Sequence, residues 1–377
     1  MNEITTLLQQ LVAIDSINPD LVPGGAGESN IARFVAEWLE HAGLEVELDE
    51  PAPGRPNVIG IARGTGGGRS LMLNAHMDTV GVVGMERPHD PFIQDNRLYG
   101  RGAYDMKGGL AAIMTAAAAA RQRNLRGDVV VTAVVDEEYA SIGTRSIVKR
   151  WHADAAIVTE PTELNICIAH KGFIWLEIET TGIAAHGSRP DLGIDAIAKM
   201  GKVLVGLEKL DRSLRSTSSH RLLHSGSLHA SLIQGGQELS SYPQQCILRV
   251  ERRTIPGETQ QQVESQISSL LNQVAATDPN FKASLRTTLV RDAFEVSEDQ
   301  LIVKTLQQHA RTLLDHEPTI YGATPWMDSA ILSAAGIPTV VFGPGGEGAH
   351  ALVEWSDLEQ VERCSEILIA VAEEFCS

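Results

Sequence analysis

Cysteine is scarce in this chain of 377 residues, which contains only four. Cys167, Cys246, Cys364 and Cys376 lie far apart and never form a CxxC pair. A disulfide-rich scaffold and a zinc finger are therefore excluded, because both need closely or regularly spaced cysteines. The same scarcity is typical of a reducing compartment, and we expect a cytoplasmic protein.

Long apolar runs and an excess of basic charge are also lacking. No stretch approaches the length that spans a membrane, and residues 1–15 lack the basic start and continuous apolar core of a signal peptide. The net charge is −17, whereas nucleic acids and anionic membranes attract basic surfaces. We therefore expect neither a nucleic acid nor a membrane as a partner.

A glycine loop that opens a helix, which marks a dinucleotide-binding site, is missing as well. The glycine run GTGGGRS at residues 64–70 leads into the apolar segment LMLNAHM at residues 71–77, which has the character of a strand. A hairpin turn is the better interpretation of that run. This argues against an oxidoreductase that depends on a dinucleotide cofactor.

The sequence does contain enough apolar residues, 43% of the total, to bury a full core. Apolar strands near residues 71–77, 127–138 and 153–163 alternate with helical segments. This alternation predicts an α/β fold with a mostly parallel sheet covered on both faces. In such sheets ligands bind beyond the carboxyl ends of the strands.

The pattern changes after about residue 176. A strand, a helix, two strands, a helix and a strand follow in that order, which is typical of a small α+β, ferredoxin-like sandwich. We therefore predict a catalytic domain made of residues 1–176 and 291–377, with residues 177–290 inserted as a second domain.

Polar residues gather where the predicted strands end and in the adjoining loops. Alternation along a strand places the side chains of His76 and Asp78 on the same face. The full set comprises His76, Asp78, Glu137, Glu138 and Glu160 after strands, and Asp105 and His350 in loops. We expect these side chains to meet at one edge of the sheet.

Electrostatics indicates what such a cluster binds. Asp105, Glu138 and Glu160 carry three negative charges, and crowding them without a counter-charge would cost several kcal/mol. Two divalent ions remove this cost, and imidazole with carboxylate suits zinc, with cobalt or manganese also possible. We predict two Zn²⁺ ions per chain, with His76 as a ligand and Asp78 orienting its ring.

Each of these residues also has an ordinary interpretation. Glu137 and Glu138 would suit a solvated turn, Asp105 would suit a helix N-cap, and His350 would suit an exposed loop. The metal interpretation is favoured because all of them occur together at the ends of buried segments.

Three segments strengthen the interpretation of the cluster as a metal site: GRGAYDMKGG at 100–109, DEE at 136–138 and ERRTIPGET at 251–259. With them the chain resembles, nearly end to end, the co-catalytic zinc amidohydrolases that include acetylornithine deacetylase, succinyl-diaminopimelate desuccinylase, aminoacylase and glutamate carboxypeptidase. The resemblance implies a zinc-hydrolase catalytic domain with an inserted lid domain that forms a homodimer. It also implies a cis peptide bond after Asp105.

The resemblance further implies a role for each residue of the cluster. One metal is bound by His76, Asp105 and Glu160, and the other by Glu138, His350 and the shared Asp105. Glu137 is the general base, which takes a proton from a metal-bridging water and passes it to the leaving nitrogen.

The inserted domain supplies further candidates by the same resemblance. His186 in GIAAHGSRP would reach across the dimer to stabilise the oxyanion, and Arg253 would bind the carboxylate of the substrate. Gly345 and Gly346 would either offer backbone amides to that carboxylate or only turn the chain toward His350. Ser240 stands where many relatives have asparagine, which leaves the acyl or oxyanion contact open.

The expected function is therefore metal-dependent removal of an acyl group from an N-acyl amino acid, as in acetylornithine deacetylase. A carboxypeptidase or dipeptidase that acts on short peptides is the alternative on the same machinery. A non-catalytic binding descendant is disfavoured, because such a protein would have no reason to keep Glu137 together with five ligands.

Overall fold

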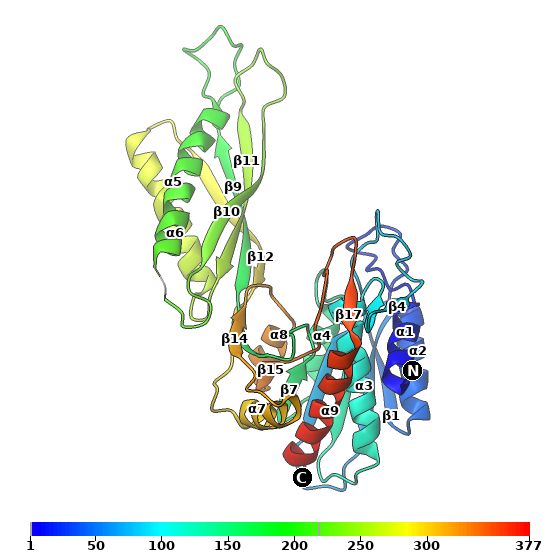
Figure 1. Cartoon of the computed structure of the whole chain (residues 1–377). Coiled ribbons are helices and arrows are strands. Elements are labelled where there is room, and N and C mark those ends of the chain that lie inside the picture. The colour runs from blue at the N-terminus through cyan, green and yellow to red at the C-terminus, as the bar shows by residue number, and fades with distance from the viewer. Residues whose placement is uncertain (1, 218) are drawn as a thin grey trace. The chain divides into compact units, whose positions relative to one another are not determined.

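The computed structural model describes residues 2–217 and 219–377, which separate into two compact units (Figure 1). Unit 1 comprises Met1–Ile168, Val296–Tyr321 and Met327–Ser377, and unit 2 comprises Ala169–Glu295 with Gly322–Trp326. Unit 2 is thus an insertion in the sequence of unit 1. Its bounds differ from the expected 177–290, because the change in sequence pattern after residue 176 falls inside a strand rather than before it.

The large sheet has a parallel centre. Strands β6, β3, β7 and β15 are neighbours in that order and run parallel, whereas the flanking pairs are antiparallel. In sheet order the strands are β1 (Glu45–Ala52), β2 (Arg55–Ala62), β6 (Val129–Val134), β3 (Leu71–His76), β7 (Ala155–Val158), β15 (Thr339–Val341), β8 (Ile166–His170) and β13 (Phe294–Glu295), with β14 (Ile320–Ala323) paired to β8. The predicted α/β fold class is confirmed.

The central strands are apolar along their whole length because helices cover the sheet. Every residue of β3, β6 and β7 is buried, as expected of strands that pack on both faces. Helix α3 packs against α1 and α9, α9 packs against α7, and α4 packs against α8 (Figure 1). The helices of unit 1 are α1 (Glu3–Val12), α2 (Ser29–His41), α3 (Gly108–Arg121), α4 (Ile142–Arg150), α7 (Leu301–Leu314), α8 (Ser329–Ala334) and α9 (Leu358–Phe375).

Helix α3 approaches the end of β7 very closely. A Cβ atom at Gly109 would lie 2.2 Å from the carbonyl oxygen of Thr159, so the approach requires glycine. A one-turn π-helix, η1 (Ala103–Lys107), precedes α3 and contains Asp105. The close approach therefore brings Asp105 and Glu160, which follows Thr159, to the same end of the sheet.

A small antiparallel sheet holds the segment around His350. Its strands are ordered β16 (Gly346–Glu347), β17 (Trp355–Asp357), β5 (Arg97–Tyr99) and β4 (Phe92–Gln94). Trp355 pairs with Tyr99, so the loop between β16 and β17 is fixed beside the segment that leads from β5 into η1. Residues that are far apart in the sequence, Asp105 and His350, are thereby held on neighbouring segments.

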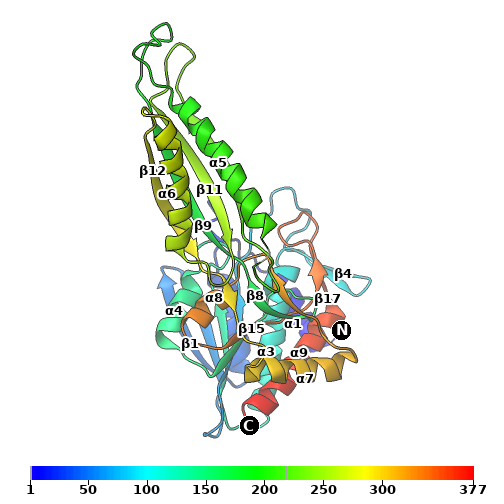
Figure 2. The same ribbon diagram turned by 90° about the vertical axis from the view of Figure 1, so that its left-hand side faces the viewer.

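Unit 2 is a second sheet with two helices. Figure 2 shows α5 and α6 side by side along the strands. The sheet order is β10 (Ser227–Gly235), β11 (Gln245–Thr254), β9 (Gly172–Thr181) and β12 (Ala283–Arg291), with helices α5 (Ala196–Ser216) and α6 (Gln260–Thr277). The chain order β9-α5-β10-β11-α6-β12 is the one that the sequence predicted. Alternating residues of β9 and β11 point into a core shared with both helices.

Among the described residues, no helix combines the length and apolar character needed to cross a membrane.

Candidate metal centre

Five predicted ligands of unit 1 lie together, with Asp105 between two imidazoles. The Nε2 atom of His76 lies 3.2 Å from Oδ1 of Asp105 and 3.7 Å from Oε1 of Glu160. The Nε2 atom of His350 lies 3.5 Å from Oδ2 of Asp105 and 3.1 Å from Oε2 of Glu138. The two carboxylate oxygens of Asp105 therefore face two different sets of potential ligands.

Each of these side chains comes from a different segment at the same end of the sheet. His76 ends β3, Glu138 follows β6 and Glu160 follows β7. Asp105 lies in η1, and His350 lies in the loop between β16 and β17. The peptide bond between Asp105 and Met106 is cis, as the resemblance implied.

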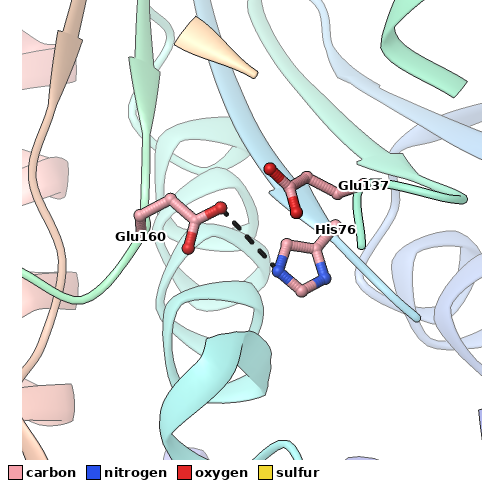
Figure 3. Close-up of side chains that lie close together, drawn as sticks. All are labelled: His76, Glu137 and Glu160. Atoms are coloured by element: carbon pink, nitrogen blue, oxygen red, sulfur yellow. Dashed lines mark ion pairs between the residues drawn. The ribbon is translucent and has the colours of Figure 1, made fainter. Parts of the chain in front are cut away.

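Glu137 faces the same cluster. Figure 3 shows the carboxylates of Glu137 and Glu160 both beside the imidazole of His76, with a dashed line that joins Glu160 to the ring. The ligand atoms of these three residues lie within 4.8 Å of one another, and so do those of His76, Asp105 and Glu138. His76 belongs to both groups.

Negative charge in this cluster exceeds what the histidines can neutralise. Burial raises the pKa of Glu137 and Glu138, and it raises the pKa of Glu160 to about 8. Burial opposes protonation of His76, but its hydrogen bond to Asp105 and the surrounding carboxylates raise its pKa well above the ordinary value. Hydrogen bonds to Asp105 and Glu138 raise the pKa of His350 to about 10. The protein chain by itself therefore balances part of this negative charge by keeping protons on these glutamates and histidines.

The residues fit a pair of divalent cations. The Oε1 atom of Glu138 is buried and has no hydrogen-bond partner among the described residues, so one ligand atom is left without any counterpart. Buried polar atoms in native proteins are almost always satisfied, and a cation would satisfy this one. A set of imidazole nitrogens and carboxylate oxygens suits zinc, cobalt or manganese.

Asp78 contacts His76 in a way that the sequence predicted only in part. The Nδ1 atom of His76 lies 2.9 Å from the backbone oxygen of Asp78 and 3.6 Å from its carboxylate. The carboxylate instead accepts hydrogen bonds from the backbone N–H groups of Glu137 at 3.1 Å and Glu138 at 3.2 Å. Asp78 therefore ties the end of β3 to the segment after β6.

Glu354 was missed by the sequence analysis, although it supports Asp105 directly. Its Oε1 atom accepts hydrogen bonds from the backbone N–H groups of Tyr104 at 3.0 Å and Asp105 at 3.1 Å. Its other oxygen is paired with Arg101 at 2.5 Å. No spacing in the sequence indicates this contact, because 249 residues separate Glu354 from Asp105.

Of the two glycines proposed as a carboxylate site, Gly346 has its amide paired within the chain. The N–H group of Gly346 donates to Oε1 of Glu163 at 3.2 Å, and the carbonyl oxygen of Gly345 accepts from the N–H group of Asp357 at 2.9 Å. A carboxylate of the chain itself therefore occupies the amide of Gly346. A substrate would have to displace Glu163 to use it.

His186 lies in an exposed turn of unit 2. Its Nδ1 atom lies 2.8 Å from the hydroxyl oxygen of Ser188, and its backbone bridges to Ser241. The neighbouring Gly187 donates its N–H to the carbonyl oxygen of Ser240 at 2.7 Å. Ser240 is therefore held next to His186 by the backbone, and its side chain is exposed.

Arg253 and Arg252 point to opposite faces of β11, as strand alternation predicts. The Nε atom of Arg253 donates to Oε1 of Glu251 at 2.6 Å, and its guanidinium lies 5.0 Å from the centre of the Phe173 ring. Arg252 is fully buried and pairs with Glu258. The partly exposed Arg253 is the one of the two that a ligand can reach.

Comparison with known proteins identifies the family of this chain. The model of the peptidase family M20/M25/M40 matches residues 72–374. The chain belongs to this family. The resemblance drawn from the sequence is confirmed, and the class of reaction is hydrolysis of an amide bond.

Two relatives illustrate the range within the family. The chain is 30% identical to an N-formyl-4-amino-5-aminomethyl-2-methylpyrimidine deformylase from Bacillus subtilis, with 94% of this chain and 91% of the relative covered. It is 29% identical to an acetylornithine deacetylase from Myxococcus xanthus, with 98% of this chain and 96% of the relative covered.

Solved structures share the fold. A tripeptidase from Staphylococcus aureus superposes with a TM-score of 0.81 at 21% identity, covering 99% of this chain and 98% of that one. A Bacillus subtilis protein described as a dinuclear metal binding peptidase of family M20 superposes with a TM-score of 0.77 at 18% identity, covering 99% and 97%.

The raised pKa values predict how the metal-free protein responds to pH. Glu160 has a pKa of about 8 in the folded chain against an ordinary 4.5, and His350 has about 10 against 6.5. At pH values between the ordinary and the raised pKa of each group, the folded chain keeps a proton that the unfolded chain has lost. The free energy of unfolding therefore falls as the pH rises from 4.5 to about 8 for Glu160 and from 6.5 to about 10 for His350. Divalent ions would displace these protons, and zinc binding at pH 7 is therefore expected to release them.

Two measurements check this expectation. Urea unfolding of the metal-free protein at about pH 6 and about pH 9 gives the slope, and calorimetric titration with Zn²⁺ in buffers of different ionisation heat counts the protons released. Zinc binding without proton release would contradict the assignment of these carboxylates and imidazoles to the metal site.

Proposed function

We propose that the chain is a metal-dependent hydrolase that removes an acyl group from an N-acyl amino acid. The proposal depends on the position of Glu137, a half-buried carboxylate that faces His76 and Glu160 within one cluster. Burial and the charge of Glu160 raise the pKa of Glu137, which suits a group that accepts and returns a proton near neutral pH. Both curated relatives described above carry names of enzymes that remove a small acyl group from an amine nitrogen.

The cluster would hold two metal ions, with zinc as the first choice. His76, Asp105 and Glu160 would bind one, and Glu138, His350 and Asp105 the other, in keeping with the two faces of the Asp105 carboxylate. When bound, the ions would polarise the amide carbonyl and lower the pKa of water.

Residues of this chain would then move the proton. Glu137 would accept it from the attacking water and deliver it to the leaving nitrogen. Its position is supported by Asp78, whose carboxylate accepts hydrogen bonds from the backbone N–H groups of Glu137 and Glu138. The same Asp78 contacts Nδ1 of His76 through its backbone oxygen, which leaves Nε2 directed at the acids of the cluster.

Unit 2 would recognise the rest of the substrate. We assign the carboxylate of the amino acid to Arg253, whose guanidinium is partly exposed and is held by Glu251 and the Phe173 ring. His186 would donate to the developing oxyanion. Gly345 and Gly346 would form a second site for the same carboxylate. The amide of Gly346 would contribute only if Glu163 moved away, so Arg253 is the preferred anchor.

A homodimer through unit 2 is part of the proposal. Strand β10 lies at the edge of its sheet and, among the described residues, pairs only with β11. Its residues Leu232 and Ile233 are 61% and 54% exposed, and exposed apolar edge strands favour pairing with another chain. We also propose a cytoplasmic location, in keeping with four buried cysteines that form no disulfide in the described structure.

A peptidase is the second candidate. It is favoured by the tripeptidase and the dinuclear metal binding peptidase among the solved structures with this fold. The same Glu137 and Arg253 would serve a short peptide, because a C-terminal carboxylate and an amide bond occur in both substrate classes.

Replacing the proposed base tests the function most simply. Glu137→Gln keeps the shape of the side chain but removes its ability to accept a proton, so we expect kcat to fall by about 10² to 10⁴. The content of bound metal should match that of the parent protein, since Glu137 is not among the proposed ligands. Turnover at the parent rate would exclude Glu137 as the base.

Arg253→Ala separates recognition of the carboxylate from the chemistry. We expect kcat/KM for N-acetyl amino acids to fall about tenfold or more, and that for their carboxamide analogues to stay unchanged. Arg249→Ala, on the same strand and paired with Glu177, is the matched control. An equal loss on acids and carboxamides would remove the carboxylate role, and faster turnover of dipeptides than of N-acyl amino acids by the parent would favour the peptidase.

Mixed dimers test whether His186 acts on the partner chain. His186→Ala and Glu137→Gln chains are each expected to be inactive alone, and mixing them should restore part of the activity, because one site then has an intact base and an intact histidine. Dimers of two His186→Ala chains serve as the control. Mixed dimers that form but stay inactive would place His186 outside the partner's site.

A further inference from the structure

A line of buried polar side chains leads from the proposed metal centre into unit 1. It begins at Asp78, which contacts His76, and continues through Asn18 and Asp136 to Arg55. Asn18, Asp78 and Asp136 are each fully buried. None of the proposed catalytic steps uses Asn18, Asp136 or Arg55.

Asn18 joins the two acidic residues through one amide group. Its Nδ2 atom donates to Oδ2 of Asp78 at 2.8 Å and to Oδ1 of Asp136 at 2.9 Å. Its own oxygen accepts the backbone N–H groups of Asp20 at 3.0 Å and Leu21 at 3.1 Å. Every hydrogen-bonding site of the Nδ2 group is therefore spent on the two carboxylates, and the side chain cannot turn over without breaking four contacts.

The two carboxylates that Asn18 joins hold Glu137 and Glu138 from both ends. Asp78 accepts the backbone N–H groups of these two glutamates. Asp136, which directly precedes them, has a left-handed backbone with φ of 67° and accepts the N–H group of Ala140 on its Oδ2 at 3.2 Å. The bent segment that carries the proposed base and one proposed ligand is thus bonded directly to Asp78, and the Asn18 amide links Asp78 in turn to Asp136 at the start of that segment.

Arg55 supplies the positive charge for this line. Its NH1 atom lies 3.1 Å from Oδ1 of Asp136, and its Nε atom donates to Oε2 of the buried Glu28 at 2.8 Å. One buried guanidinium therefore faces two buried carboxylates. Asp78 is a third buried carboxylate, and among the described residues its ion-pair partner is the neighbouring His76. The neutral amide of Asn18 satisfies Asp78 and Asp136 without adding charge.

We propose that Asn18, backed by Arg55, is a positioning residue of the metal centre: it orients Asp78 and thereby sets His76 and the Glu137–Glu138 segment for metal binding and proton transfer. The inference rests on the proposed function, because it assumes that the cluster binds metal. Residues behind metal ligands commonly alter metal affinity or activity by about 10-fold to 100-fold when they are replaced.

Two substitutions at Asn18 separate its hydrogen bonds from its packing. Asn18→Asp keeps the shape but removes both donors and adds a charge between two carboxylates, and Asn18→Ala removes the contacts. For both we expect the dissociation constant for Co²⁺ to rise about tenfold or more, measured by competition with a chromogenic chelator. The visible spectrum of bound Co²⁺, which reports its ligand geometry, should change, and kcat should fall more than KM rises.

Asn57→Ala provides the matched control. Asn57 is also buried in unit 1, and its Nδ2 atom donates to Oδ2 of Asp49 and to the carbonyl oxygen of Gly143, each at 3.1 Å. It also accepts the N–H group of Val135 at 3.0 Å, so it supports the same strand end without touching Asp78. We expect it to lower the free energy of unfolding while leaving Co²⁺ affinity and spectrum unchanged.

The outcomes distinguish this inference from the proposed function. Parent protein that binds no Co²⁺ would overturn both. Asn18 variants that bind Co²⁺ as tightly as the parent, with the same spectrum, would overturn the positioning role and leave the metal centre in place. An equal loss of Co²⁺ affinity in Asn57→Ala would also overturn it, because the effect would then follow from general destabilisation.

Discussion

Buried carboxylates need matching positive charge, and this requirement explains most of what is unusual in unit 1. Glu137, Glu138, Glu160 and Asp105 converge at one end of the sheet, and burial raises the pKa of the first three. The two histidines take up part of the imbalance, since contact with these acids raises the pKa of both. Protonating carboxylates at neutral pH costs free energy, whereas two divalent ions would neutralise the same charges directly.

The scaffold holds the acids in place with other acids. Asp78 accepts the backbone N–H groups of Glu137 and Glu138, and Glu354 accepts those of Tyr104 and Asp105. A carboxylate that binds backbone amides fixes the path of the chain while its neighbour's side chain stays available for a ligand. The parallel strands bring these segments to one edge, so the fold determines where charge accumulates and the buried hydrogen bonds determine how it is oriented.

Much of this arrangement was predictable from sequence, because it follows from local patterns. Apolar strands that end in acid or histidine indicated the parallel sheet and the cluster at its edge. The resemblance added the expected role of the inserted domain as a lid and the expected role of each residue in the cluster, including His350.

Other contacts had no signal in the sequence. Asn18 and Glu354 reach the centre through tertiary contacts that no spacing reveals, and they belong to segments with ordinary polar composition. Gly346 shows the opposite case: a glycine-rich segment suggested an open anion site, but its amide is taken by Glu163.

The most direct test of the account is a count of metal ions per chain. Metal-free protein would be equilibrated with Zn²⁺, freed of excess ion by gel filtration and analysed for zinc and protein together, with a chain that carries Asp105→Ala beside it. The account predicts two zinc ions per parent chain and a marked loss in the variant, because Asp105 faces both sets of ligands. A parent chain that retains no zinc, cobalt or manganese would contradict it.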